Sequence, residues 1–342
     1  MSIKIVLNGA GRIGKSILKQ LLNDENFKIV AINEINPSIE NIVYSINYDS
    51  TYGKLNDKFK VIENSFIQNQ KSKIKITNYK DISELNLDGV DILIDASGQK
   101  TDLNKLRNLK VDKIILTHPQ KDADINIVLG VNEEKIDLKN HKIISTSSCN
   151  ATALLPALKL IDDKKEIICG DIVTIHPLLN HQRVLDGSFV QSATRDVDLN
   201  FEFGRSSTQN IIPSQTTTIK ACSYVLEKFN SNLISSNSLR VPTDTVGVIN
   251  VTLFTKEISS KDEIKNLFLE FERNQKFPIV LNNFEALVSS DFKKEKFTTI
   301  IDHRFLEVKQ NMIKLLLWYD NEWGYASKVV EILKYIDIKK AR

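Results

Sequence analysis

A cysteine stands at the point where a short apolar run gives way to a helical pattern. In the segment KIISTSSCNATALLPALKLI (142–161), small hydroxylated residues precede Cys149 and apolar residues follow it at helical spacing. A thiol at a helix N-terminus has its thiolate stabilised by the helix dipole and by free backbone N–H groups, and the same groups can hold an oxyanion. We therefore predict that Cys149 is a nucleophile, although a cysteine is often only a small buried apolar residue.

A histidine that could activate this thiol follows the alternating run at 171–175. His176 opens the polar segment HPLLNHQR (176–183). A lone histidine at the end of a strand is more often structural than catalytic. Beside a thiol nucleophile, however, an imidazolium would activate the sulfur, and the imidazole could then accept a proton during the reaction. We predict that Cys149 and His176 form a catalytic pair.

Three glycines follow the first apolar run, in the pattern G-A-G-R-I-G. Gly9 would permit a sharp turn, Gly11 would let the backbone approach a pyrophosphate, and Gly14 would allow close packing of the following helix. A dinucleotide-binding loop of this kind requires a carboxylate roughly 20 residues on, and Glu34 stands there. Glu34 would bind the ribose hydroxyls and repel a 2′-phosphate, which favours NAD over NADP. A tight turn without a ligand is the structural alternative. The other residues assigned to the cofactor site are Arg12, Ile13, Ser97, Gly98 and Thr117.

Short β-rich runs alternate with helical patterns in the first half of the chain, which is typical of a parallel sheet. Long alternating runs follow in the second half, at 171–175 and 246–255, as in a sheet with one solvated or interface-facing side. Ser260 and Glu263 form a predicted capping box, and a final helix is expected at about 324–336. Further expected strands are 3–8, 27–33, 91–97, 113–117, 142–147, 297–301 and 312–319. The sequence predicts an α/β protein with a Rossmann-type parallel-sheet NAD domain and an α+β catalytic domain whose large sheet is mostly antiparallel.

The composition is that of a folded, water-soluble chain. Its 342 residues predict two domains, and 42% hydrophobic and 26% charged residues fit that class. The net charge of +3 excludes the concentrated basic surface that nucleic acid or an anionic membrane would demand. Glycines and charges interrupt the N-terminal apolar run, which argues against a signal peptide, and no stretch approaches the length of a membrane span.

The three cysteines are widely spaced and odd in number, so they form neither a metal-ligand pattern nor a disulfide framework. We therefore predict a cytoplasmic protein without a metal site. Cys169 and Cys222 lie within ordinary strand and helix patterns, and we interpret both as small buried apolar residues.

Six ordered segments, spread over nearly the whole chain, are similar to the glyceraldehyde-3-phosphate dehydrogenase family. They are NGAGRIGKS (8–16), which resembles N-G-F-G-R-I-G; SSCNATALLPALKLI (147–161), which resembles the nucleophile segment S-C-T-T-N; SSTQNIIPSQTTTIKA (206–221), which resembles Q-N-I-I-P-S-S-T-G-A-A-K-A; LRVPT (239–243), which resembles R-V-P-T; VSSDF (288–292); and WYDNEWGYASKVV (318–330).

The resemblance implies that Cys149 is the nucleophile and His176 the base. Asn321 would orient the nicotinamide carboxamide, and Tyr325 would pack near the nicotinamide ring. The implied reaction is the NAD-dependent oxidation of glyceraldehyde 3-phosphate to 1,3-bisphosphoglycerate in glycolysis, through a thioester on Cys149 that inorganic phosphate cleaves. A homotetramer is implied as well. The implied division is an NAD-binding domain at 1–148, a catalytic domain at 149–320 and a C-terminal helix at 321–342 that packs back on the NAD domain.

Several residues around the expected anion site depart from the family pattern. Asn150 and Ala151 stand where the family has two threonines, Leu179 and His181 where it has threonines after the histidine, and Thr217 in place of a glycine. Losing hydroxyl donors should weaken phosphate binding, since a hydrogen bond to a charged group contributes roughly 1.5–3 kcal/mol. The segment 186–205 is longer than usual, and in this family that loop approaches the cofactor of a neighbouring subunit.

Cationic residues could still keep the pocket suited to an anion. By resemblance Arg240 and Thr216 would help bind the phosphates and Ser148 would line the site of the attacking phosphate, while His181 and Arg183 add positive charge or lie in a solvated loop. The predicted substrate and phosphate residues are Ser148, Asn150, His181, Arg183, Thr216, Thr217 and Arg240.

Three functions therefore compete. The first is the phosphorylating glyceraldehyde-3-phosphate dehydrogenase. The second is a sister enzyme for erythrose 4-phosphate or another sugar aldehyde, with hydrolytic release as a variant; Glu34, His118 and the missing threonines favour it, whereas the unusual nucleophile segment does not. The third is a non-catalytic NAD-binding scaffold, which has no need for Cys149, His176 and Asn321 together.

Overall fold

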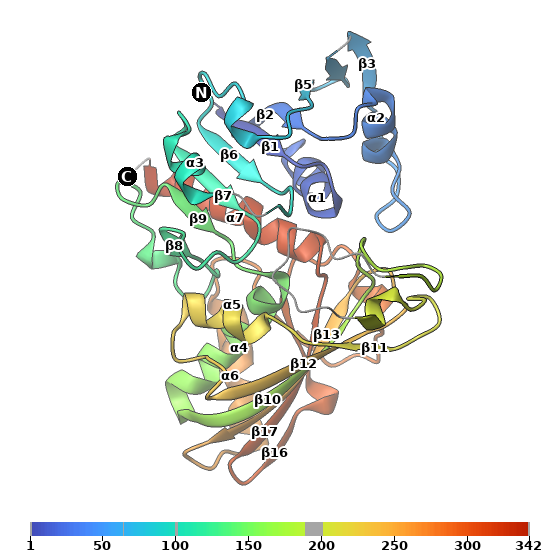
Figure 1. Ribbon diagram of the computed structural model, residues 1–342. Helices are drawn as coiled ribbons and strands as arrows, with labels where there is room; N and C mark the ends of the chain where they lie inside the picture. Colours follow the sequence, from blue (N-terminus) through green and yellow to red (C-terminus); the bar gives the residue numbers. More distant parts are fainter. Residues whose placement is uncertain (1, 64, 100–101, 189–200, 341–342) are drawn as a thin grey trace. The chain divides into compact units, whose positions relative to one another are not determined.

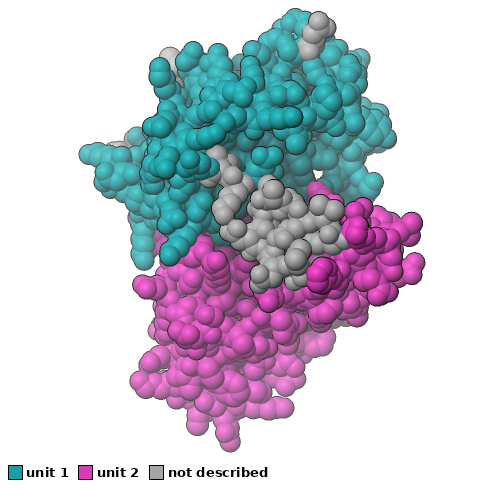
Figure 2. Space-filling model, in the orientation of Figure 1, with its two compact units in different colours: residues 1–127, 135–146, 326–342 teal, residues 128–134, 147–325 magenta. Residues whose placement is uncertain are grey.

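The computed structural model describes residues 2–63, 65–99, 102–188 and 201–340. The chain divides into two units, drawn in different colours in Figure 2. Unit 1 comprises residues 1–127, 135–146 and 326–342, and unit 2 comprises residues 128–134 and 147–325. The α/β class is confirmed, while the expected division at 148 and 320 stays a prediction. In the described ranges, no helix is both long and apolar enough to cross a membrane.

Unit 1 contains a sheet in which nine strands are described, in the order β3-β4-β5-β2-β1-β6-β7-β9-β8 (Figure 1). The seven strands that follow one another in space from β5 to β8 are paired in parallel. At the other end of this order, β3 and β4 add an antiparallel edge. Their bounds are β1 Ile3–Asn8, β2 Phe27–Asn33, β3 Lys60–Glu63, β4 Phe66–Gln68, β5 Lys73–Thr77, β6 Ile92–Asp95, β7 Lys113–Leu116, β8 Ile125–Asn126 and β9 Ile143–Ser145. The helices are α1 Arg12–Leu21, α2 Ile39–Asn47, α3 Leu103–Asn108 and α7 Trp323–Lys340, the last of which starts in unit 2.

The central strands form because their apolar runs are buried on both faces, as parallel sheets require. All residues of β6 and β7 are buried, and Ile5 and Leu7 of β1 are wholly buried. The expected strands at 3–8 and 27–33 are confirmed residue for residue, and that at 142–147 is shorter because Ser147 turns into the left-handed region with φ 59°. The short β3–β5 edge was not predicted, since β3 is exposed along its whole length and lacks an apolar pattern.

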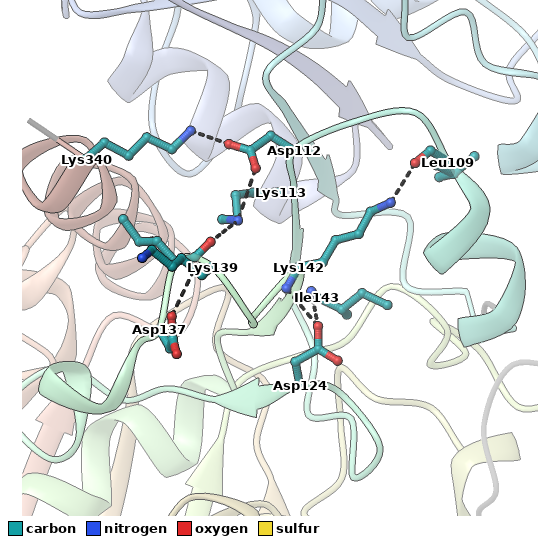
Figure 3. Close-up of polar contacts among 10 residues, drawn as sticks. Leu109, Asp112, Lys113, Asp124, Asp137, Lys139, Lys142, Ile143 and Lys340 are labelled. Carbon is teal, nitrogen blue, oxygen red and sulfur yellow. Dashed lines mark hydrogen bonds and ion pairs between the residues drawn. The ribbon is translucent and has the colours of Figure 1, made fainter.

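Charged side chains tie the end of α7 to the sheet of unit 1 (Figure 3). Lys113 is buried at the start of β7, where its Nζ donates to the Leu138 carbonyl at 2.7 Å and pairs with Asp112 at 3.1 Å. Asp112 also accepts from Lys340 in the last turn of α7. Burial alone would raise the pKa of Asp112, but these two lysines hold it below its ordinary value. The bonds explain why α7 continues beyond 336, where the apolar pattern had placed its end.

The described part of unit 2 contains a mostly antiparallel sheet in the order β11-β12-β10-β13-β17-β15-β14, with β16 paired to β17. Only the pairs β10–β12 and β14–β15 are parallel among those described. Strand bounds are β10 Ile167–His176, β11 Ile212–Ser214, β12 Ile234–Arg240, β13 Gly247–Thr255, β14 Val280–Asn283, β15 Thr299–Asp302, β16 Glu307–Lys309 and β17 Met312–Tyr319. The helices are α4 Cys149–Lys165, α5 Thr218–Val225 and α6 Lys261–Asn274, and α4 packs on β10, β13, β15 and β17 (Figure 1).

Two predictions about unit 2 are confirmed and one is wrong. The capping box of α6 is present, with Ser260 accepting from the Glu263 N–H at 3.1 Å, and Cys222 is wholly buried in α5. Cys169, in contrast, is exposed. The register of β10 against β13 shifts between Ile167 and Cys169, so the alternation of buried and exposed side chains is broken at this point.

The buried lysine of unit 1 offers a test of this packing. Lys113→Met removes the donor to the Leu138 carbonyl, and we expect a loss of about 1–3 kcal/mol in the free energy of unfolding. Lys309→Met is the matched control, because Lys309 pairs with Glu307 on an exposed strand and should change stability by no more than about 0.5 kcal/mol. Urea unfolding of both variants gives the comparison, and equal effects would contradict the assignment.

Candidate active site

Cys149 is the first residue of α4, as predicted. The hydroxyl of Ser148 caps the helix by accepting from the Ala151 N–H at 3.2 Å. The turn before the cap is strained, since Ser147 has φ 59°, a conformation that costs a residue other than glycine about 1–3 kcal/mol. The Tyr325 hydroxyl donates to the Ser147 carbonyl at 3.1 Å. This contact supports the turn that delivers the thiol to the helix N-terminus.

His176, the last residue of β10, faces the thiol. Its Nε2 lies 3.9 Å from the Cys149 Sγ, and the ring is buried. On the other side of the ring, Nδ1 lies 2.9 Å from the Pro177 carbonyl oxygen, which can only accept a hydrogen bond. Nδ1 therefore carries the proton of a neutral ring, and Nε2 presents its lone pair. The structure brings together the two residues predicted as a catalytic pair.

The pKa of the Cys149 thiol is raised, whereas its place at a helix N-terminus had led us to expect a stabilised thiolate. Burial raises the pKa of Cys149 to about 11. The positive charge of Arg240 and the N–H groups of Asn150 and Cys149 act in the opposite direction, as expected at a helix N-terminus, but desolvation outweighs them. Formation of the thiolate at neutral pH therefore depends on a base, and the nearby Nε2 of His176 is placed to serve as one.

Four neighbouring strands end or begin at the edge where this pair lies. His176 is the register partner of Arg240 on the parallel strand β12, and β13 starts with Gly247 opposite Tyr319, the last residue of β17. A Cβ on Gly247 would lie only 2.5 Å from the Tyr319 hydroxyl oxygen, so the wholly buried tyrosine requires glycine there. The topology thus gathers a base, a cation and a phenol at one edge of the sheet.

Hydroxyl and amide groups extend the site beyond the thiol. Asn150 is buried, and its Nδ2 donates to the Thr218 hydroxyl at 2.9 Å. The Thr218 and Thr216 hydroxyl oxygens lie 2.6 Å apart, and Thr217 between them is exposed. Sequence reasoning missed Thr218 and Tyr319, although Tyr319 closes an apolar strand and Thr218 adjoins a predicted anion residue.

The cationic residues after His176 are engaged elsewhere. Arg183 is exposed and donates to the Ser188 carbonyl at 3.1 Å, and the His181 ring packs 5.7 Å from that of Phe203. Neither contact involves Cys149, so the predicted role of these two residues in binding the anion stays a prediction. Most of the lengthened segment 186–205 lies outside the described residues.

The two residues expected near the nicotinamide are buried and oriented. The Oδ1 of Asn321 accepts from the Thr245 hydroxyl at 3.2 Å and from the Val246 N–H at 3.1 Å. These bonds fix the carboxamide through its oxygen, and its nitrogen always carries two donor hydrogens. Tyr325 is held through its hydroxyl at Ser147.

The glycine loop of unit 1 has the geometry of a dinucleotide site. Gly9 has φ +96°, and a Cβ on Gly14 would lie 2.0 Å from the Gly9 carbonyl oxygen, so neither position accepts a side chain. A Cβ on Gly11 would meet no atom within 4 Å. Open space at the second glycine is what the approach of a pyrophosphate requires. A cavity of about 590 Å³ adjoins the loop and is lined by Gly9, Gly11, Glu34 and Ser97, among other residues.

The other residues predicted for the cofactor site differ in the contacts that their side chains make. Glu34 lines the cavity while its Oε2 accepts from the Ala10 N–H at 2.8 Å. The guanidinium of Arg12 pairs with Asp49 at 2.7 Å and lies over the Tyr52 ring, so its side chain is bound within the protein. The Ser97 hydroxyl donates to the Asp95 carboxylate, and the Thr117 hydroxyl donates to the Asp95 backbone carbonyl. Ile13 and Gly98 have no polar side-chain atoms, so they could bind a cofactor only through the backbone or by packing.

Comparison with known proteins supplies the deciding observation. A family model described as "Glyceraldehyde 3-phosphate dehydrogenase, C-terminal domain" matches residues 148–321, and one described as "Glyceraldehyde 3-phosphate dehydrogenase, NAD binding domain" matches residues 3–103. The chain belongs to the glyceraldehyde 3-phosphate dehydrogenase family. It is accordingly an NAD-dependent dehydrogenase.

Curated members of the family align over nearly the whole chain. The glyceraldehyde-3-phosphate dehydrogenase of Priestia megaterium (strain DSM 319 / IMG 1521) is 33% identical over 346 residues, with 99% of each chain covered. Glyceraldehyde-3-phosphate dehydrogenase 1 of Bacillus subtilis (strain 168) is 31% identical over 342 residues, with 98% of each chain covered. The glyceraldehyde-3-phosphate dehydrogenase of Buchnera aphidicola subsp. Schizaphis graminum (strain Sg) is 34% identical over 346 residues, covering 99% of this chain and all of its own.

The glycines of the NAD-binding domain can be tested separately. Gly11→Ala should leave the fold intact, because its Cβ meets open space, but should weaken NAD binding roughly tenfold or more by blocking the pyrophosphate. Gly14→Ala should instead destabilise the domain, because its Cβ would overlap the Gly9 carbonyl. Calorimetric titration with NAD and thermal unfolding without NAD separate the two effects. Unchanged NAD affinity in Gly11→Ala would refute the assigned loop.

The base in this family member can be tested through thiol chemistry. His176→Asn should slow the alkylation of Cys149 by iodoacetamide at pH 7 roughly 100-fold, because the thiol loses its proton acceptor. The difference should shrink as the pH approaches about 11, where hydroxide deprotonates the thiol directly. Peptide mass spectrometry follows Cys149, with the exposed Cys169 as an internal control whose rate should not change. A gap that persists up to pH 11 would exclude this role of His176.

Proposed function

We propose that this protein oxidises glyceraldehyde 3-phosphate to 1,3-bisphosphoglycerate with NAD and inorganic phosphate, through a thioester on Cys149. The observation that carries the proposal is the 3.9 Å approach of the His176 Nε2 to the Cys149 Sγ, in a chain whose full-length relatives bear the name of this activity. The alternatives are not favoured. The relatives described above are not named for another aldehyde, and a non-catalytic scaffold does not require a paired thiol and imidazole.

The first step uses the pair directly. The thiol proton passes to Nε2 of His176, and the sulfur attacks the aldehyde carbon to form a hemithioacetal. The N–H groups of Cys149 and Asn150, which already point at the sulfur, are placed to hold the oxygen that becomes negative. His176 then returns the proton to this oxygen, which leaves the imidazole neutral again.

The oxidation requires the imidazole a second time. When bound, NAD would supply the acceptor for a hydride from this carbon. His176 takes the hydroxyl proton in the same step, and the carbon becomes the carbonyl of a thioester on Cys149. The glycine loop and Glu34 would hold the dinucleotide, and Asn321 would hold the nicotinamide carboxamide through its Nδ2.

Inorganic phosphate completes the cycle. A phosphate oxygen attacks the thioester carbonyl, the acyl phosphate forms, and the thiolate leaves and recovers a proton through His176. Arg240 and the Thr216 hydroxyl would bind the anion, because Arg240 ends β12 beside His176 and Thr216 is linked through Thr218 to Asn150, the residue after Cys149. Ser148 uses its oxygen as the helix cap but retains a donor hydrogen for this step.

Exposed apolar side chains support the proposal that several copies of the chain assemble. Val184, Leu185, Phe201 and Ile211 are each at least 65% exposed, near both ends of the segment 186–205. Such side chains favour contact with another chain, and we infer the homotetramer implied by the family. The cytoplasmic location and the place in glycolysis stay predictions.

The experiment measures NADH formation from glyceraldehyde 3-phosphate with and without inorganic phosphate. We expect turnover that requires phosphate, and loss of roughly 1,000-fold or more in Cys149→Ser, because a hydroxyl is a far weaker nucleophile than a thiolate. Erythrose 4-phosphate serves as the comparison substrate and should give the smaller kcat/KM. A larger kcat/KM for erythrose 4-phosphate, or turnover independent of phosphate, would overturn the proposal.

A further inference from the structure

Asn150 joins the nucleophile to a row of hydroxyl groups within unit 2. Its Oδ1 lies 2.5 Å from the Tyr319 hydroxyl oxygen and 3.6 Å from the Cys149 Sγ. Its Nδ2 lies 2.9 Å from the Thr218 hydroxyl oxygen, and that oxygen lies 2.6 Å from the hydroxyl of Thr216. Asn150, Tyr319 and Thr218 are buried, whereas Thr216 is partly exposed. The row therefore runs from the interior to the surface of the site.

The directions of the two hydrogen bonds made by the Asn150 carboxamide follow from its atoms. An amide oxygen only accepts, so Tyr319 donates to Asn150, and an amide nitrogen only donates, so Thr218 accepts from Asn150. Between the Thr218 and Thr216 hydroxyls, 2.6 Å apart, either can be the donor. When an anion accepts the hydrogen of Thr216, Thr218 is the one left to donate. The Thr216 oxygen also accepts from the Thr218 N–H at 3.2 Å. In that arrangement both lone pairs of Thr216 are engaged, and its own hydrogen points away from the row.

We propose that Asn150 and Thr218 are positioning residues that turn the Thr216 hydroxyl into a fixed hydrogen-bond donor for an oxyanion. The anion is a phosphate group, either inorganic phosphate or the phosphoryl group of the substrate. This inference rests on the proposed function and names how that site holds its anion. A hydroxyl that is free to rotate loses part of its donor capacity to its neighbours, whereas one with both lone pairs occupied can only donate.

The sequence supports this pairing independently. Asn150 replaces the first threonine of the family segment S-C-T-T-N, and Thr218 replaces an alanine in the run S-S-T-G-A-A. These two departures lie 68 positions apart, yet their side chains bond to each other. The chain lacks threonines that the family places around the anion, and the bonded pair directs a remaining hydroxyl toward it.

A double-mutant cycle tests the proposal. Thr218→Val removes the donor to Thr216 and should raise the KM for phosphate or for glyceraldehyde 3-phosphate roughly tenfold, with the KM for NAD within about twofold of the starting value. The KM that rises identifies the anion, and either result supports the proposal. Thr216→Val should have the same effect, and the double variant should be no worse than Thr216→Val alone. Thr218→Ser retains the hydroxyl and should behave like the unaltered protein.

Two outcomes would overturn the proposal: effects of the single variants that multiply in the double variant, or a Thr218→Val effect equal for NAD and for the anions. If Thr218→Val fails to fold, Thr218→Ala removes the same donor with a residue that the family carries there. A second assay needs no turnover. Inorganic phosphate should slow the alkylation of Cys149 by iodoacetamide in the unaltered protein, and roughly tenfold more phosphate should be required in Thr218→Ala.

The two assays also separate this inference from the proposed function. If no aldehyde is oxidised but phosphate protects Cys149 in a manner that depends on Thr218, the function fails and the inference stands. If oxidation is normal but neither the KM values nor the protection respond to Thr218, the function stands and the inference fails.

Discussion

The geometry of the catalytic unit depends on one backbone turn, at Ser147. Its left-handed conformation is unfavourable for a serine, and a hydroxyl from Tyr325, 178 positions away, bonds to its carbonyl. The turn makes Ser148 the helix cap and Cys149 the first helical residue. A helix that began one residue later would rotate the thiol by about 100° around the axis and remove it from His176. The strain at one residue thus sets the distance on which the chemistry depends.

In both units an asparagine carboxamide links side chains at or beside the ends of buried strands. In unit 1, Asn33 donates to Asn8 at 2.8 Å, and Asn8 donates to Asp95 at 3.0 Å, across the strands β2, β1 and β6. In unit 2, Asn150 occupies the corresponding role between Tyr319 and Thr218. Carboxamides suit such positions because they donate and accept at once without the desolvation penalty of a charge.

Local patterns predicted the parts of the site that depend on neighbours in sequence. The glycine loop, the helix that starts at Cys149 and the strand that ends at His176 follow from turn, cap and apolar spacing over a few residues. The partners of Asn150 could not be predicted in this way, since they lie 68 and 169 positions away. The raised pKa of the Cys149 thiol likewise follows from desolvation in the folded chain, which no short sequence pattern indicates. The Arg12 side chain, expected at the cofactor, is instead bound by Asp49, a residue outside the glycine pattern.

Arg240 links the two halves of the proposed reaction through electrostatics. Its charge lowers the pKa of the Cys149 thiol, and in the proposed reaction the same charge binds a phosphate. A bound dianion would offset the guanidinium charge and weaken its support for a thiolate, because the two anions would compete for one cation in a site of low dielectric. Phosphate therefore opposes thiolate formation before the aldehyde is attacked. Once the sulfur is acylated it carries no charge, and the cation is then fully available to the phosphate. In the proposed reaction, Arg240 therefore stabilises the Cys149 thiolate first. It stabilises the phosphate only after the sulfur has been acylated.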